Sequence, residues 1–145
     1  MNTDSSQQVL EDAHTIAVVG LSADPSKYSH AVPAYLQSIG YRIIPVHPRA
    51  ETLLGERVYR SLTDIEEPVD LVAVYRPSSE AMEITEQAVL IGARAVWLQE
   101  EVLSASAEGV AAAAGVMFFQ DRCIGRAAAG LRGWSATQSF PPGTA

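Results

Sequence analysis

Serine, lysine and arginine side chains gather in two short segments that suit a phosphate-bearing ligand. One lysine and three serines surround the predicted start of a helix, namely Lys27, Ser22, Ser26 and Ser29. The start of a helix presents free backbone N–H groups and the positive end of its dipole, which together favour anion binding. Further along the chain, Arg49 can hold a ribose phosphate through two parallel hydrogen bonds. The two segments predict a nucleotide-type anion as ligand.

The overall charge of the chain opposes this prediction, whereas the distribution of its cations favours it. Ten basic residues face 17 acidic ones, for a formal net charge of −7. A nucleic-acid-binding protein usually presents a basic face, so we expect no nucleic-acid partner. Half of the basic residues fall within one stretch of the sequence: Arg42, Arg49, Arg57, Arg60 and Arg76. They either decorate the surface or gather around one anionic ligand.

The composition predicts a cytoplasmic protein with no membrane association. The longest apolar runs, such as 15–19 and 116–119, are far shorter than the roughly 20 residues of a membrane helix. The first 11 residues contain no basic residue and no apolar run, unlike a secretory signal. The single cysteine, Cys123, excludes an intrachain disulfide and a cysteine-rich metal site.

Short apolar runs alternate with helical stretches and predict the elements that position these residues. Continuous apolar runs are typical of strands buried on both faces, and we expect such strands at 15–19, 42–46, 70–74, 95–98 and 116–119. The expected helices are 6–12, 29–39, 77–91 and 104–114, with a short strand at 57–59 and a helical turn at 62–65. This alternation implies parallel pairing through right-handed crossovers. The predicted fold is α/β and Rossmann-like: a doubly wound, mostly parallel five-stranded sheet with helices on both faces.

Local signals refine these elements. Pro45 places the second strand at an edge of the sheet or at the end of its ladder. Pro33 is compatible with its helix because it falls in the first turn, and Ser78 or Ser79 is expected to cap the following helix. From Gly125 on the sequence shows no clear period. We expect one domain over 1–130 and a flexible tail over 131–145.

Ligands of such a sheet bind beyond the carboxyl ends of the strands, where the strand order reverses. The residues at these ends are Gly20 to Ser22, His47 to Arg49, Tyr75 to Pro77, Gln99 with Glu100, and Gln120 to Cys123. An NAD site would need three glycines after the first strand and an acid after the second. Only Gly20 fits the glycines, and His47 and Arg49 stand where the acid belongs. The pattern therefore argues against NAD.

Several stretches together form a family pattern that covers most of residues 9–124. They are Ile16 to Ser22, Gly40 to Pro48, Leu54 to Glu56, Tyr59 to Leu62, Pro68 to Val72, Ala95 to Gln99, and Asp121 to Cys123. In these stretches the sequence resembles the small stand-alone CoA-binding proteins, which are similar in turn to the N-terminal domain of the succinyl-CoA synthetase alpha subunit. The pair Tyr75-Arg76 departs from the family in being bulkier and charged.

The resemblance implies that a coenzyme A nucleotide lies across the point where the strand order reverses. The loop from Gly20 to Ser29 would bind phosphates, and His47 to Arg49 would bind the adenosine with its 3′-phosphate. Tyr75 to Pro77 and Gln99 would line the path of the pantetheine arm. The expected binding residues are therefore Gly20, Leu21, Ser22, Lys27, Ser29, His47, Pro48, Arg49, Tyr75, Arg76, Pro77 and Gln99.

Two functions from different classes remain open. The leading hypothesis is a module that binds coenzyme A or an acyl-CoA, has no complete catalytic site and acts alone or with a protein partner. The alternative is an NADP-type or CoA-transfer enzyme component acting with a partner. The synthetases of the resembling family carry a phosphorylated histidine on a second domain, for which this chain has no room. Cys123 is either a buried structural residue or, if Arg122 lowers its pKa, a thiol that forms a mixed disulfide with CoA.

Overall fold

The structure, a computed structural model, describes residues 5–131 of the chain. Its helices are α1 (Ser5–Asp12), α2 (Tyr28–Ser38), α3 (Ala81–Leu90), α4 (Ala105–Ala114) and α5 (Ile124–Leu131), with the 3₁₀ turns η1 (Leu62–Asp64) and η2 (Ser78–Glu80). The strands are β1 (Thr15–Val19), β2 (Arg42–Val46), β3 (Thr52–Leu53), β4 (Glu56–Arg57), β5 (Leu71–Val74), β6 (Ala95–Leu98) and β7 (Met117–Phe119).

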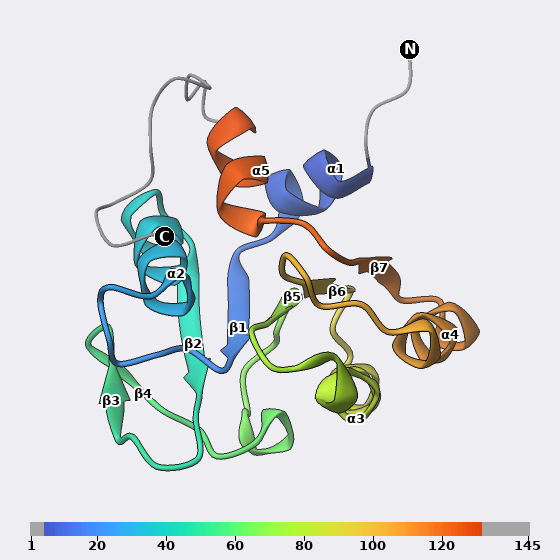
Figure 1. Ribbon diagram of the computed structural model, residues 1–145, viewed down its shortest axis with the longest axis horizontal. Coiled ribbons are helices and arrows are strands. Elements are labelled where there is room, and N and C mark those ends of the chain that lie inside the picture. The colour runs from blue at the N-terminus through green and yellow to red at the C-terminus, as the bar shows by residue number, and fades with distance from the viewer. Residues whose placement is uncertain (1–4, 132–145) are drawn as a thin grey trace.

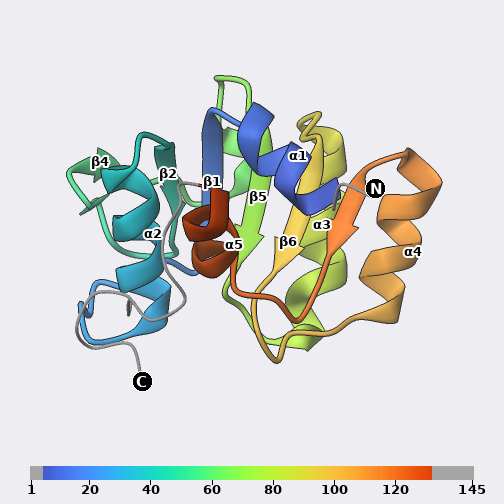
Figure 2. The ribbon, with the colours of Figure 1, turned by 90° about the horizontal axis from the view of Figure 1, so that it is seen from above.

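The main sheet has five parallel strands in the order β2-β1-β5-β6-β7, which confirms the predicted Rossmann-like architecture. Figure 1 shows helices on both faces of this sheet, and Figure 2 shows the strands side by side. The chain first adds β2 on one side of β1 and then crosses to add β5 on the other. The strand order therefore reverses between β1 and β5, which is where such folds bind ligands.

Each face of the sheet buries its own hydrophobic core because side chains alternate along the strands. Ile16 and Val18 pack towards α1, α2 and α5, whereas Ala17 packs towards α3 and α4. All residues of β5 and β6 are buried. Trp97, which is fully buried, packs against Phe119 with ring centroids 5.0 Å apart.

Pro45 confirms the edge position predicted for the second strand. Its carbonyl accepts a hydrogen bond from Tyr59 N at 3.0 Å, and His47 N donates to Tyr59 O at 3.0 Å, so this side of β2 faces away from β1. The nitrogen of Pro45 lies on the same side as its carbonyl, where the sheet needs no further donor. The short strand expected at 57–59 is instead the hairpin β3–β4 followed by this bridge.

The prediction that Pro33 lies in the first helical turn is wrong, because α2 begins at Tyr28 and places Pro33 in the second turn. Proline has no N–H, so the carbonyl of Ser29, four residues earlier, lacks its helical donor. Ser22 N donates to that carbonyl instead, at 3.0 Å. The proline thus leaves a helical carbonyl open to the loop that precedes the helix.

Two further expectations are corrected. Neither Ser78 nor Ser79 caps α3, which begins at Ala81 after η2 without a side-chain cap. Ser78 Oγ instead accepts from Leu103 N at 2.9 Å. The aperiodic segment around Gly125 forms α5, which packs against α1 and α2. Most of the expected tail, 132–145, lies outside the described residues. Within 5–131, no helix has the length and hydrophobicity to cross a membrane.

Candidate functional site

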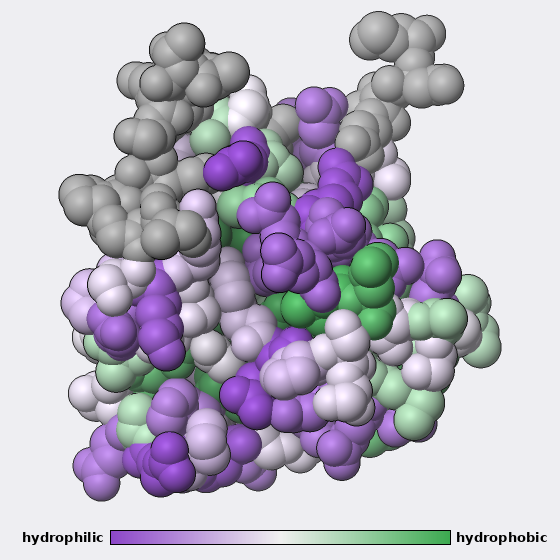
Figure 3. Space-filling view, in the orientation of Figure 1, coloured by the Kyte–Doolittle hydropathy of each residue, from purple (hydrophilic) through white to green (hydrophobic). Residues whose placement is uncertain are grey.

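A cleft of about 710 Å³ opens at the carboxyl edge of the sheet, beside the ends of β1 and β5, where the strand order reverses. The arrows of β5, β6 and β7 in Figure 2 point to this edge. The same edge faces the viewer in Figure 3, where hydrophilic side chains cover much of the surface. The cleft is lined by the loop after β1, the turn after β2, the start of the segment after β5, and one side of α3.

Ten of the 12 residues expected at the site line this cleft. They are Gly20, Leu21, Ser22, Lys27, Ser29, His47, Pro48, Arg49, Tyr75 and Arg76. The other two do not line it. Pro77 is exposed and precedes η2, while Gln99 is buried, with Oε1 accepting from Ile124 N at 3.2 Å. The structure adds several polar residues that the sequence analysis did not place there: Arg60, Ser61, Glu80, Glu83 and Gln87.

Gly20 is required where β1 ends. Its φ of +93° lies in the region that L side chains rarely adopt. A Cβ at this position would also lie 3.0 Å from both Tyr75 O and Arg76 Cδ. The backbone therefore turns sharply and passes close to the end of β5, which brings the two loops at the reversal point together.

The loop after Gly20 is fixed against the start of α2 through Ser22. Ser22 N donates to Ser29 O at 3.0 Å, and Ser22 O lies 2.7 Å from His30 Nδ1. A carbonyl can only accept, so His30 Nδ1 carries the proton in this contact. His30, whose place in the sequence beside this loop leaves a role in ligand binding open, thus positions the loop.

Asp24 organises the outer part of the same loop. Its Oδ1 accepts from Ser26 N at 3.0 Å and from Ser26 Oγ at 2.7 Å, and these bonds are the main reason that the pKa of Asp24 lies below its usual value. The Ser26 hydroxyl is therefore engaged and does not line the cleft. The loop ends at Lys27, which occupies the N-cap position of α2 and forms no side-chain cap hydrogen bond. The helix start is left open to an anion.

The turn after β2 is built around His47. Its Nδ1 accepts from Arg49 N at 3.0 Å and from Ala50 N at 2.9 Å, so the proton of the neutral ring is on Nε2. The pKa of His47 is lowered, first by burial and then by the charges of Arg49, Arg60 and Arg76. His47 is thus held in the neutral form as a hydrogen-bond donor.

Arg60 stabilises the same turn by binding its backbone carbonyls. Its guanidinium donates to His47 O at 3.0 Å, to Ala50 O at 2.6 Å and to Arg49 O at 3.2 Å. Sequence spacing gave no reason to place Arg60 here, because its position depends on the bridge between Val46 and Tyr59. Its membership of the arginine-rich stretch was the only signal.

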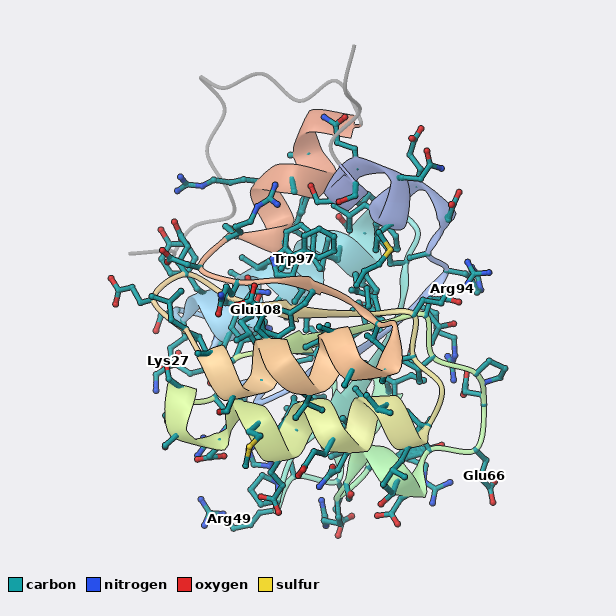
Figure 4. All side chains as sticks on the ribbon, turned by 90° about the vertical axis from the view of Figure 1, so that its right-hand side faces the viewer. Lys27, Arg49, Glu66, Arg94, Trp97 and Glu108 are labelled. Carbon is teal, nitrogen blue, oxygen red and sulfur yellow. The ribbon has the colours of Figure 1, made fainter. Side chains whose placement is uncertain are left out.

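The cations of the cleft divide into engaged and available groups. Arg76 forms a bidentate pair with Glu80, with Nε–Oε1 of 3.0 Å and Nη2–Oε2 of 2.7 Å, and Arg60 is held by carbonyls. Lys27 and Arg49 form no ion pair within residues 5–131. In Figure 4 both extend on one side of the molecule, away from Arg94 on the opposite side. The lining contains four cations against two carboxylates, although the chain as a whole is acidic.

The hypothesis that Arg122 lowers the pKa of Cys123 is wrong. Burial raises the pKa of the Cys123 thiol, and backbone hydrogen bonds from Arg126 and Gly125 only partly oppose this effect. The Arg122 guanidinium lies instead over the rings of Trp97 and Phe119, at 5.3 and 5.7 Å from their centroids. The cysteine is free and partly buried.

Comparison with protein families gives one match over most of the chain. The family model described as "CoA binding domain" matches residues 14–129. This range includes every strand and the whole cleft described above.

Individual proteins show the same likeness. The uncharacterized protein YneT of Bacillus subtilis (strain 168) is 34% identical over 118 residues, covering 81% of this chain and 87% of that protein. A solved structure from Thermus thermophilus, cell-free ID.343, has a TM-score of 0.84 at 38% identity, covering 90% of this chain and 99% of that one. The acetate–CoA ligase (ADP-forming) of Methanocaldococcus jannaschii is 25% identical over 73 residues, which are 50% of this chain but only 10% of the ligase.

Proposed function

The chain belongs to the CoA-binding domain family, and on this premise we propose that its cleft binds coenzyme A or an acyl-CoA through the phosphates and the adenosine. Membership of the family bears out the resemblance seen in the sequence. The occupant of the cleft, the residues that contact it and the absence of a reaction are the parts that we propose.

The observation that carries the proposal is that Lys27 and Arg49, two cations without an ion pair in the described part of the chain, line one cleft at the reversal point. Lys27 stands at the uncapped start of α2, where N–H groups and the helix dipole favour a pyrophosphate. Arg49 follows β2, and its planar guanidinium can form two parallel bonds with a 3′-phosphate. The ribose of coenzyme A carries both groups, a pyrophosphate on one side and the 3′-phosphate on the other.

His47 complements Arg49 on the adenosine side. Because its Nδ1 is occupied by backbone donors, Nε2–H is the group that it can offer to the ligand. The Arg60 guanidinium holds the carbonyls of the turn and so fixes the backbone that carries Arg49. The turn thus presents two hydrogen-bond donors to the ligand: Nε2–H of the neutral His47 ring and the charged guanidinium of Arg49.

We propose that the module has no complete catalytic site. His47 and His30 each use Nδ1 to hold the backbone, and burial raises the pKa of Cys123. Within residues 5–131 no group of three His, Cys, Asp or Glu residues is placed to hold a metal ion. A cytoplasmic location and action with a protein partner that supplies chemistry are part of the same proposal. The unpaired Cys123 agrees with a reducing compartment.

Ligand-induced stabilisation against heat tests the proposal. The full chain is melted alone and with CoA, acetyl-CoA, dephospho-CoA, NADP and NAD at modest salt. A ligand at a hundred times its Kd stabilises the folded state by about 2.7 kcal/mol, which for a chain near this size raises Tm by roughly 5–10 °C. We expect that shift with CoA, a smaller one with dephospho-CoA and none with NAD. No shift with CoA, or a larger one with NADP, would sink the proposal.

A further inference from the structure

Two polar side chains at the ends of β5 and β6 are neighbours in the register of the sheet and lie on the same face of it. In the β5–β6 ladder, Ala73 pairs with Trp97 and Val74 with Leu98, and Gln99 N extends the ladder by donating to Val74 O at 3.3 Å. The next pair in this register is Tyr75 and Gln99. Because side chains alternate, both point to the face of Ala73 and Trp97, which α5 covers.

Both residues bury a polar group that has no hydrogen-bond partner within residues 5–131. These groups are the Tyr75 hydroxyl and Gln99 Nε2. Gln99 is only 6% exposed. Its orientation is fixed, because the atom that faces Ile124 N must be the acceptor Oε1, which leaves Nε2 as the unpartnered donor. A buried donor without a partner bears the full loss of its hydration, so such a pair needs an explanation.

The surroundings define what the two groups can bind. Burial raises the pKa of Tyr75 well above its usual value, and the neighbouring Cys123 and Glu100 act in the same direction. The hydroxyl therefore keeps its proton and is a donor beside the Gln99 amide. The negative charge of Glu100 disfavours an anion at this position. Two neutral donors beside a carboxylate suit a neutral acceptor, and a carbonyl oxygen accepts two hydrogen bonds.

We propose that Tyr75 Oη and Gln99 Nε2 together bind a carbonyl oxygen on the uncharged arm of the ligand whose phosphates occupy the cleft. This inference rests on the proposed function, since it assigns one end of the same ligand. Tyr75 also lines the cleft, so the buried pair adjoins the space that the phosphates would occupy. An amide and a thioester carry the same oxygen chemistry, and acyl-CoA contains both.

Titration calorimetry with three ligands separates the contribution of the nucleotide to affinity from that of the arm. Adenosine 3′,5′-bisphosphate carries the nucleotide without the arm, CoA adds the amide carbonyls, and acetyl-CoA adds the thioester. For the unaltered protein we expect CoA to bind at least tenfold more tightly than the bisphosphate. Tyr75→Phe should lower the affinity for CoA about tenfold, as expected for one lost hydrogen bond to a buried group. Its affinity for the bisphosphate should change less than twofold.

A tyrosine elsewhere provides the matched control. Tyr41 Oη is bonded to Leu10 O at 2.5 Å, so Tyr41→Phe should lower Tm and leave all three affinities unchanged. Tyr75→Phe removes a hydroxyl that has no partner among residues 5–131 and should keep or raise Tm. Gln99→Met removes the amide donor together with the acceptor for Ile124 N, and should reproduce the loss of CoA affinity with some loss of Tm.

The outcomes separate this inference from the proposed function. If a variant loses more affinity for acetyl-CoA than for CoA, the two donors bind the thioester carbonyl. If it loses the same affinity for both ligands, they bind an amide carbonyl. If all three ligands bind the unaltered protein and neither variant weakens CoA relative to the bisphosphate, the inference is overturned while the proposed function stands. If none of the three ligands binds the unaltered protein, both fail.

Discussion

The two edges of the sheet each carry a hollow, and the hollows differ in charge and in helix polarity. The hollow at the amino edge, of about 340 Å³, is lined by Gln8, Val9, Asp12, Ala13, Asp70, Arg94, Gly115 and Met117. It contains one cation and two carboxylates, whereas the cleft at the carboxyl edge contains four cations and two carboxylates. Figure 4 shows Arg94 on the side of the molecule opposite Lys27 and Arg49.

Chain direction explains much of this difference. In a parallel sheet with helical crossovers, helices begin at the carboxyl edge and end at the amino edge. The open start of α2 therefore faces the cleft, while the end of α4 at Gly115 faces the other hollow. Acids at the amino edge serve the backbone: Asp70 Oδ2 accepts from His14 N and Thr15 N, each at 2.9 Å. An anion is favoured at one edge and disfavoured at the other by the same topology.

Replacing one glycine at each edge tests whether the close approach of loops is confined to the carboxyl edge. Gly20→Ala places a Cβ at 3.0 Å from Tyr75 O in a backbone with φ of +93°. We expect it to lower the free energy of unfolding by roughly 2–4 kcal/mol through strain and displacement of the loop. Gly115→Ala meets no atom within 4 Å and should cost only about 1 kcal/mol for its positive φ. Urea denaturation measures both, and equal losses would contradict the comparison.

Replacing one arginine at each edge tests the assignment of charge. Arg49→Gln should weaken CoA binding roughly tenfold to a hundredfold, the value of a charge-assisted hydrogen bond of about 1.5–3 kcal/mol. Its affinity for dephospho-CoA should change little. Arg94→Gln removes the same charge from the amino edge and should leave both affinities as they are. If Arg49→Gln weakens CoA and dephospho-CoA equally, Arg49 does not contact the 3′-phosphate.

A smaller effect concerns pH and the turn after β2. The pKa of His47 is lower in the folded chain than the ordinary histidine value of about 6.5, so as pH falls the unfolded chain takes up the proton first. The contribution of His47 to stability is therefore full above about pH 6.5 and decreases as pH falls towards the folded pKa, by at most about 1.4 kcal/mol per pH unit.

Asparagine isolates this contribution. His47→Asn keeps an oxygen acceptor for Arg49 N and Ala50 N but does not titrate, so its stability should fall less than that of the unaltered protein between pH 7 and 5.5. Urea denaturation at each pH provides the data, and parallel curves for His47→Asn and the unaltered protein would refute the assignment.

The strands could be predicted because a buried parallel strand is a continuous apolar run, as β5 and β6 are. α5 could not be predicted, since its buried positions are mostly alanines, Ala128 and Ala129 after Ile124, and such a stripe has little contrast with its flanks. The predicted cap of α3 was wrong for a different reason. Ser78 has the right type and position, but tertiary structure gives its hydroxyl to Leu103 N.

The candidate site followed from topology more than from motifs. Knowing where strands end was enough to gather residues such as Lys27, His47 and Arg49 in one cleft. The same rule gives the end of the strand at Gln99 but not the helix that later covers it, so it could not show that Gln99 is buried and lies outside the cleft lining. The roles of Arg60 and His30 could not be predicted, because each side chain binds the backbone of another segment and local sequence spacing does not indicate such contacts.

Pro33 shows how an engineering rule can mislead in this fold. A stability designer who scans helices for prolines would replace Pro33 with alanine and expect a tighter helix. The new N–H would compete for Ser29 O, the carbonyl that now anchors Ser22. The repaired helix would therefore loosen the loop beside it, and a gain in thermal tolerance would be accompanied by a less ordered entrance for the ligand. An imperfection in the helix is here the means by which the loop keeps its shape.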